Sequence, residues 1–292
     1  MSREKSNNIM EKRCGATIID LSLPVLEGGF EPFPINIRRV SHAQGASFLS
    51  KDIIFSKHTP LSQNMRNLWH YLTGKRRLTR ESFPDGEFIS EEKITLSVHT
   101  GTHLDAPYHF GSFCEGKPAK TIERIPLEWC YGNGVVLDHT GKAPGETIGK
   151  ADIIAALSKI RYEIQPFDIV LIQTNADKYW GKKEYFHMFP GMSAEATEYL
   201  VESGVKVIGI DSMGFDRPFE GMLNDYFKTH DSGYLWPAHI YGRKKEYCHI
   251  ERLANLDQIP KPYGFTVACF PIKVNGVGAA WIRAVAIVNH CP

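Results

Sequence analysis

The sequence lacks any marked imbalance of charge. Its 292 residues carry 34 Lys and Arg against 33 Asp and Glu, which gives no electrostatic reason to expect a nucleic acid or an anionic membrane as a partner. No run approaches the ~20 consecutive apolar residues of a membrane helix. Residues 1–13 are polar and lack the apolar core of a signal peptide. These absences predict a cytoplasmic protein that binds neither nucleic acid nor membrane.

Paired cysteines and nucleotide-binding glycines are also missing. The six cysteines form no C-x-x-C pair, so we expect reduced thiols instead of a disulfide framework. The stretch Gly276-Val277-Gly278 lacks the third glycine and the following helix of a dinucleotide-binding loop. No internal repeat is present. The 42% of hydrophobic residues is ordinary for a globular protein that buries a sizeable core.

Hydrophobic periodicity predicts a mixture of strands and helices. The expected strands cover residues 17–21, 94–99, 134–138, 168–172, 205–211, 265–272 and 282–288. The expected helices cover residues 61–72, 150–160 and 193–203. Helices alternate with strands only in the middle of the chain, so we predict a mixed α/β or α+β fold and not a doubly wound sheet throughout.

The expected domain organisation is simple. Residues 1–15 resemble a disordered tail, and residues 16–292 form a single domain. Within it, residues 41–86 are rich in polar residues and proline and lack steady periodicity. Long irregular segments are usually functional or mobile, so we expect an insertion or lid here.

The densest chemical signal is the stretch of residues 99–109, HTGTHLDAPYH. In an extended strand, His99 and Asp105 would lie roughly 20 Å apart. In a helix, Asp105 would point about 120° away from His99, and Pro107 also disfavours a helix. A turn at residues 100–102, where glycine permits an unusual backbone conformation, would bring His99, His103 and Asp105 around one point.

Two imidazole nitrogens and a carboxylate oxygen suit Zn²⁺, Mn²⁺ or Fe²⁺ and leave positions open for water. His109 lies further along, beyond Pro107, and could carry a proton. The alternative is a strand end with solvated histidines. Three of only 12 histidines fall within these eleven positions, and this density favours the metal site.

The stretch from His99 to His109 resembles the H-x-G-T-H-x-D-x-P-x-H motif of the cyclase family, which includes bacterial kynurenine formamidase and isatin hydrolase. Every fixed position of the motif is filled. Similarity extends from residues 18–22 to residues 283–287. The resemblance implies a swivelling β/β/α fold with a strand-rich core and a few packed helices.

The resemblance also implies a second metal position. His239 and Glu251, which precedes Asn255-Leu256, match the residues that complete it in the family, with Asp105 bridging two ions. Strand alternation places His249 on the same face as Glu251, so His249 is a competing ligand. The alternative is a surface salt bridge between a histidine and a glutamate. The chain is therefore expected to hold one or two Zn or Mn ions.

Three functions fit these residues. The first is a metal-dependent hydrolase that cleaves an amide, formamide, lactam or lactone with a metal-activated water, while His109 moves the proton. The second is a metal-dependent cyclase or dehydratase in the biosynthesis of a polyketide or other natural product. The third is a metal-binding protein without catalysis. Aromatic residues at 179–180 and 185–189 suggest a small substrate with an aromatic or cyclic group, and we expect a homodimer or higher homo-oligomer.

Overall fold

The computed structural model describes residues 15–52 and 54–290. Contacts between Cα atoms divide the chain into two compact units. One unit is the segment Glu31–Ser97, and the other contains the chain before it, up to Phe30, and all of the chain from Val98 onward. The two units are described separately below.

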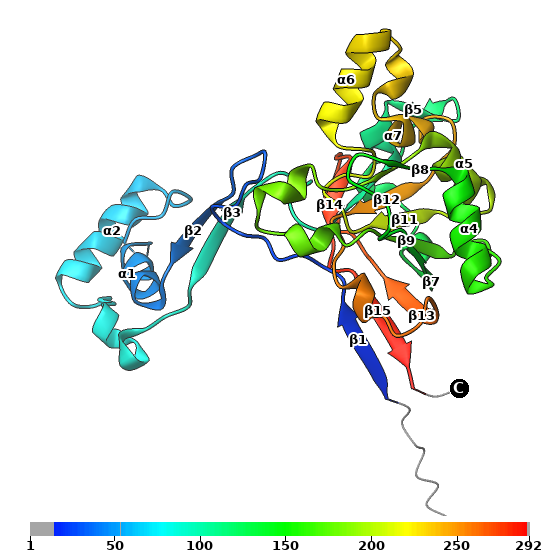
Figure 1. The fold of residues 1–292 in the computed structure, drawn as a ribbon. Helices are drawn as coiled ribbons and strands as arrows, with labels where there is room; N and C mark the ends of the chain where they lie inside the picture. Colours follow the sequence, from blue (N-terminus) through cyan, green and yellow to red (C-terminus); the bar gives the residue numbers. More distant parts are fainter. Residues whose placement is uncertain (1–14, 53, 291–292) are drawn as a thin grey trace, which may run out of the picture. The chain divides into compact units, whose positions relative to one another are not determined.

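The larger unit is built on one nine-stranded sheet (Figure 1). Across the sheet the strands follow the order β1-β15-β13-β7-β9-β11-β12-β4-β14. Their bounds are β1 Ala16–Asp20, β15 Val285–Asn289, β13 Tyr263–Ala268, β7 Tyr131–Asp138, β9 Ile169–Gln173, β11 Val207–Ile210, β12 Cys248–Glu251, β4 His103–Asp105 and β14 Ala279–Trp281. Two further two-stranded pairs join β5 Phe113–Cys114 to β6 Lys117–Pro118, and β8 Thr147–Ile148 to β10 Gly191–Met192.

The centre of this sheet is parallel and its flanks are antiparallel. Strands β7, β9, β11 and β12 run parallel to one another. Antiparallel pairs attach β13, β15 and β1 on one side and β4 and β14 on the other. The architecture is therefore the mixed α/β fold that the sequence predicts.

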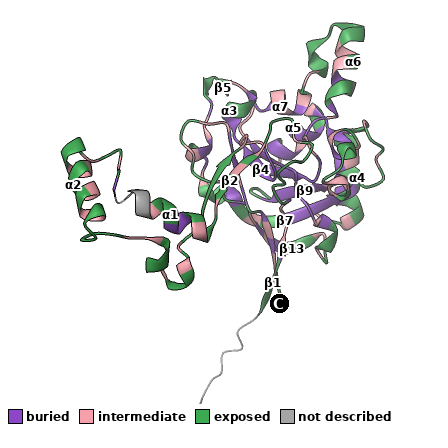
Figure 2. Ribbon diagram, turned by 90° about the vertical axis from the view of Figure 1, so that its left-hand side faces the viewer, coloured by how far each residue is buried: buried purple, intermediate pink, exposed green. Residues whose placement is uncertain are grey.

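Side chains on both faces of the central strands are buried (Figure 2). Along β9, Ile169 and Leu171 belong to one hydrophobic cluster, and Val170 and Ile172 to another. A strand that is buried on both faces is continuously apolar, as β9 is. The helices of this unit are α3 Pro107–Phe110, α4 Lys150–Ile160, α5 Ala194–Glu202, α6 Phe219–Thr229 and α7 Pro237–Tyr241. Helices α4 and α5 contribute to the second cluster and so cover that face.

The smaller unit has little core of its own. It pairs β2 (Asn36–Val40) with β3 (Glu91–Thr95) and contains α1 (His42–Asp52) and α2 (Leu61–Leu72). Gly45, Ala46 and Ile54 are the only buried residues among those of this unit whose burial is described. Its exposed large apolar side chains are Phe33, Phe48, Phe55, Leu61, Met65, Trp69, Leu72, Ile89 and Ile94.

Most of the predicted elements are confirmed, although the ends of several strands differ. The predicted strand at 94–99 ends at Thr95, so His99 does not lie on a strand face but in the following turn. The predicted strand 265–272 ends at Ala268, and the predicted strand 282–288 begins only at Val285. At the first two of these boundaries the apolar pattern continues beyond the last paired residue, and at the third it begins before the first paired residue, so periodicity alone misplaces the boundary. Helix α1 was not expected, because its sequence lacks helical periodicity.

Within the described residues, no helix combines the length and the apolar character needed to cross a bilayer. Cys114, Cys130, Cys248 and Cys269 are buried and free, as expected for reduced thiols. Cys14 and the predicted tail up to residue 14 lie outside the described residues, as does Cys291.

Candidate metal centre

The turn predicted at residues 100–102 is present. Gly101 has φ of 67°, a left-handed conformation that glycine adopts without strain. The next residue, Thr102, anchors the turn by two hydrogen bonds. Its hydroxyl donates to the carbonyl of Arg252 and accepts from the backbone N–H of Leu23. The turn brings His99 Nδ1 to 3.0 Å from Asp105 Oδ1. The approach of His99 to Asp105 is the one that the spacing of these residues predicts.

Strand register supplies the next residues. In the antiparallel pair β4–β12, Asp105 lies opposite His249, and His103 lies opposite Glu251. Residues directly opposite each other project from the same face of a sheet. All four side chains therefore point to one side, although residues 103–105 and 249–251 are far apart in sequence.

Helix α7 adds His239 to this face. Asp216 accepts hydrogen bonds from the backbone N–H groups of Ala238 and His239 in the first turn of α7. The Asp216 carboxylate also lies 2.5 Å from His239 Nδ1. One buried carboxylate thus fixes both the start of the helix and the orientation of the imidazole.

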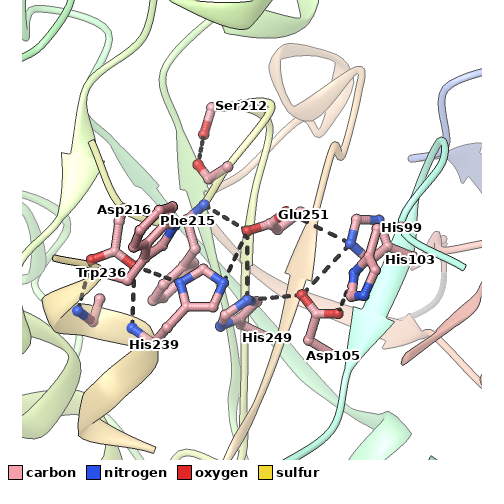
Figure 3. Close-up of polar contacts among 12 residues, drawn as sticks. His99, His103, Asp105, Ser212, Phe215, Asp216, Trp236, His239, His249 and Glu251 are labelled. Atoms are coloured by element: carbon pink, nitrogen blue, oxygen red, sulfur yellow. Dashed lines mark hydrogen bonds and ion pairs between the residues drawn. The ribbon is translucent and has the colours of Figure 1, made fainter. Parts of the chain in front are cut away.

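The result is two carboxylates between two pairs of histidines (Figure 3). His99 and His103 lie on one side of Glu251, and His239 and His249 lie on the other. Glu251 Oε1 is 3.6 Å from the Nε2 atoms of both His239 and His249, and Oε2 is 3.6 Å from His103 Nε2. Asp105 Oδ2 is 3.0 Å from His249 Nε2 and 3.6 Å from His103 Nε2.

Several of these atoms are buried without a hydrogen-bond partner. They are His103 Nε2, His249 Nε2 and both carboxylate oxygens of Asp105. Orphaned buried polar atoms are rare, because each one costs free energy. Four of them converge from the two strands β4 and β12 and indicate a site for a cation, and His, Asp and Glu donors are the usual set for Zn²⁺ or Mn²⁺.

The imidazole rings are held in the tautomer that metal binding requires. His103 Nδ1 lies 2.8 Å from the carbonyl of Gly101, and His239 Nδ1 faces Asp216. His249 Nδ1 lies 3.3 Å from the Tyr247 hydroxyl, which itself donates to the carbonyl of Ala238. Because these acceptors engage the Nδ1–H groups, Nε2 is in each ring the nitrogen that can bind an ion once it carries no proton.

Two groups of donors lie close enough to share an ion. The ligand atoms of Asp105, His239, His249 and Glu251 are all within 4.8 Å of one another, and so are those of His99, Asp105 and His109. Asp105 belongs to both groups. Proximity thus also makes His109, expected as a proton carrier, a candidate ligand.

The carboxylates and imidazoles of the cluster shift one another's pKa values. Burial alone would raise the pKa of Asp105, but the surrounding imidazoles hold it well below its usual value. Burial alone would lower the pKa of His249, but Asp105 and Glu251 raise it to about 9. His109 is different: desolvation within the cluster outweighs the attraction of Asp105 and lowers its pKa to about 4.

All six predicted site residues therefore gather in one place, namely His99, His103, Asp105, His109, His239 and Glu251. Sequence reasoning kept His249 only as a competitor and missed Asp216. The sequence pointed to His249 because the alternation of side chains along a strand places it on the same face as Glu251. No sequence signal marked Asp216, because its role depends on the packing of α7.

Similar proteins were found by sequence. A family model described as "Putative cyclase" matches residues 19–217. Kynurenine formamidase of Bacillus cereus is 29% identical over 129 residues, which cover 44% of this chain and 54% of that protein. Kynurenine formamidase of Bacillus thuringiensis is 30% identical over the same shares of both chains. The alignment with these curated relatives thus spans about half of their length.

Similar folds extend over nearly the whole chain. The structure of an isatin hydrolase bound to the product analogue thioisatinate has a TM-score of 0.65 and 21% identity, and covers 94% of this chain and 93% of its own. Isatin hydrolase A from Ralstonia solanacearum has a TM-score of 0.64 and 20% identity, and covers 94% and 92%. At these identities the similarity establishes the fold.

Proposed function

The chain belongs to the cyclase family, and on this premise we propose that it is a metal-dependent hydrolase. The bond cleaved is the carbon–nitrogen or carbon–oxygen bond of an amide, formamide, lactam or lactone. The observation that carries the proposal is the set of orphaned donor atoms of His103, Asp105 and His249. The kynurenine formamidases and isatin hydrolases among the similar proteins support hydrolysis as the reaction.

The residues that would hold divalent ions, Zn²⁺ or Mn²⁺, are those of the metal centre. His99, His103 and Asp105 would hold one ion, and Asp105, His239 and Glu251 a second. When bound, such an ion polarises the carbonyl group of a substrate and lowers the pKa of water. The side chain of His99 is 32% exposed, so the substrate has access from the side of the turn.

His109 is the proposed proton carrier. Its ring centroid lies 4.3 Å from that of His99 and 5.5 Å from that of His239, and the residue is exposed to solvent. Its low pKa keeps the ring neutral at pH 7, so it can accept a proton from water. The same ring can then return the proton to the leaving nitrogen or oxygen.

The remaining expectations complete the proposal. The substrate would be a small molecule with an aromatic or cyclic group, and the protein a cytoplasmic homodimer or higher homo-oligomer. Residues 41–86 fall within the unit Glu31–Ser97, and we propose that they form an insertion or lid in a single domain of residues 16–292.

The direct test is a substrate screen with a variant of His109. Metal-loaded protein should hydrolyse at least one of an N-formyl arylamine, isatin and an aryl lactone, and a chelator should abolish the turnover. His109→Asn should keep its metal content and lose roughly 10²–10⁴-fold in turnover. His187→Asn, at an exposed histidine outside the cluster, is the matched control.

Two results would contradict parts of this proposal. Fully metal-loaded protein that hydrolyses none of the three substrate classes would exclude the hydrolase. Loss of metal from His109→Asn would instead make His109 a ligand, as its distance from His99 and Asp105 allows.

A further inference from the structure

The ring of His249 is held rigidly in the metal centre by its neighbours. Its ring stacks on Phe215, with centroids 4.3 Å apart and planes 10° apart, and packs against Phe110 at 4.9 Å. The residue is fully buried. Together with the Tyr247 hydroxyl at Nδ1, these contacts leave the ring one direction for Nε2, which faces Asp105 and Glu251.

The distances around His249 Nε2 fit a common ion better than a hydrogen bond. Nε2 lies 3.0 Å from Asp105 Oδ2 but has no hydrogen-bond partner of acceptable geometry. Donors at about 2.0–2.2 Å from a tetrahedral ion lie roughly 3.3–3.6 Å from one another. Nε2 of His249 lies 3.0 Å from Asp105 and 3.6 Å from Glu251, and His239 lies 3.6 Å from Glu251, which brackets this range; all four ligand atoms lie within 4.8 Å of one another.

We propose that His249 is the fourth donor of a closed site formed with Asp105, His239 and Glu251, which releases its ion slowly. Four protein donors fill a tetrahedral coordination shell, as in structural zinc sites, whereas a catalytic site keeps a position open. The ion on the side of His99 is then the one that meets water and substrate. This inference rests on the proposed function, because it assigns different roles to the two ions of that centre.

Exposure of the donors agrees with this division. The side chains of His249 and Asp105 are 0% exposed, and those of His239 and Glu251 are 13% and 11% exposed. Among the donors of the other ion, His103 is also 0% exposed, but the side chain of His99 is 32% exposed, and the neighbouring His109 is exposed. An ion held among buried donors exchanges slowly, because its ligands must move apart before it can leave.

The rate of ion release tests the proposal. Full-length protein loaded with Zn²⁺ is mixed with a chelating dye, and the released ion is followed over time. We expect two phases of equal amplitude, the slow one at least 100-fold slower than the fast one. Loading with Co²⁺ should give the intense visible absorption of a four-coordinate ion, and that signal should persist after the fast phase is complete.

Variants identify the residue responsible. His249→Asn keeps a polar atom near the position of Nδ1, beside Tyr247, and removes Nε2. It should accelerate the slow phase at least 100-fold, more than the 10–100-fold that outer hydrogen-bond partners are worth. His139→Asn is the matched control, because His139 is also buried with an orphaned Nε2 but has Asp152 and Asp138 as charged neighbours.

Each outcome decides between the two ideas. Release of both ions in a single phase, or an unchanged slow phase in His249→Asn, would overturn the closed site while hydrolysis by the loaded protein still upholds the proposed function. A slow phase without hydrolysis of any substrate class would uphold the closed site and reject the hydrolase. If His249→Asn does not fold, the two phases and the cobalt spectrum of the unmodified protein decide alone.

Discussion

The two halves of the metal centre are held by different means. The motif half, His99 to His109, is a turn stabilised by backbone groups: the carbonyl of Gly101 orients His103, and Thr102 bonds to the carbonyl of Arg252. The assembled half, which comprises His239, His249 and Glu251, is oriented by buried side chains, a carboxylate at His239 and a phenol at His249. The motif half reaches solvent through His99 and His109, whereas no side chain of the assembled half is more than 13% exposed.

This difference suggests a division of labour. A half that meets solvent can exchange water and admit a substrate, and its histidines need only be placed correctly. A closed half with rings locked by aromatic neighbours can hold an ion through many turnovers. Asp105 belongs to both donor groups. A substitution that displaces the Asp105 carboxylate from one ion should therefore also weaken binding of the other ion.

The largest effect is expected from breaking the motif half. His103→Ala removes a donor that faces both Asp105 and Glu251 at 3.6 Å, so the first ion should be lost and turnover should fall at least about 10⁴-fold. Elemental analysis and turnover measure the two effects. His187→Ala serves as the control, and a full metal complement in His103→Ala would contradict the assignment.

The two halves also differ in how far the sequence reveals them. The spacing of His99, His103 and Asp105 allows the three side chains to meet at one ion only if the chain turns between them. The arrangement of the motif half can therefore be predicted from local geometry. His249 and Glu251 meet Asp105 and His103 through strand register, which depends on the pairing of distant strands. Asp216 depends in addition on how α7 packs, and no periodicity in the sequence records that.

The same limit applies to the fold. The central strands and helices α4 and α5 follow from apolar patterns that match burial in the structure, whereas α2 forms where it is predicted although none of its residues is buried. Strand ends such as Thr95 and Ala268 depend on where a partner strand stops, so periodicity extends them too far. Helix α1 could not be predicted, because its apolar residues do not recur at helical spacing.

Breaking the assembled half should have a smaller effect. Glu251→Gln keeps the size of the side chain and removes the charge that faces three histidines. Metal content should fall from two ions to one, with turnover reduced roughly 10–100-fold because the motif half still holds its ion. Glu202→Gln, which removes the charge from an exposed ion pair with Lys245 and keeps an acceptor for the Tyr241 hydroxyl, is the control. One ion in both the unmodified protein and the variant would make this a one-metal protein.

The pH dependence of the metal-free protein isolates the charge in the assembled half. The carboxylates raise the pKa of His249 from 6.5 to about 9 in the folded state, so its contribution to stability is fully present below pH 6.5 and lost as pH rises through 9. The loss should be of the order of 3 kcal/mol. Urea unfolding between pH 6 and pH 10 measures it, and His249→Asn should abolish it. A stability that is equal at both ends of the range would contradict the charged imidazole.

The smallest effect should come from the outer partner of the assembled half. Asp216→Asn weakens the acceptor that keeps the proton on His239 Nδ1, so His239 Nε2 should be a poorer donor and the affinity for the second ion should fall 10–100-fold. Either orientation of the new amide also sets an NH₂ group against the backbone N–H of Ala238 or His239, so some loss of stability is expected as well.

Metal titration separates these two consequences of Asp216→Asn, and ¹⁵N spectra of His239 report the tautomer directly. Asp231→Asn is the matched control, because Asp231 also accepts a backbone N–H, from Gly233, but orients no histidine. A shifted tautomer with weaker binding at one site only would show that Asp216 acts through His239. Reduced stability with an unchanged tautomer and unchanged affinity would reduce Asp216 to a helix cap. The assembled half would then depend on Tyr247 and the aromatic rings around His249 alone.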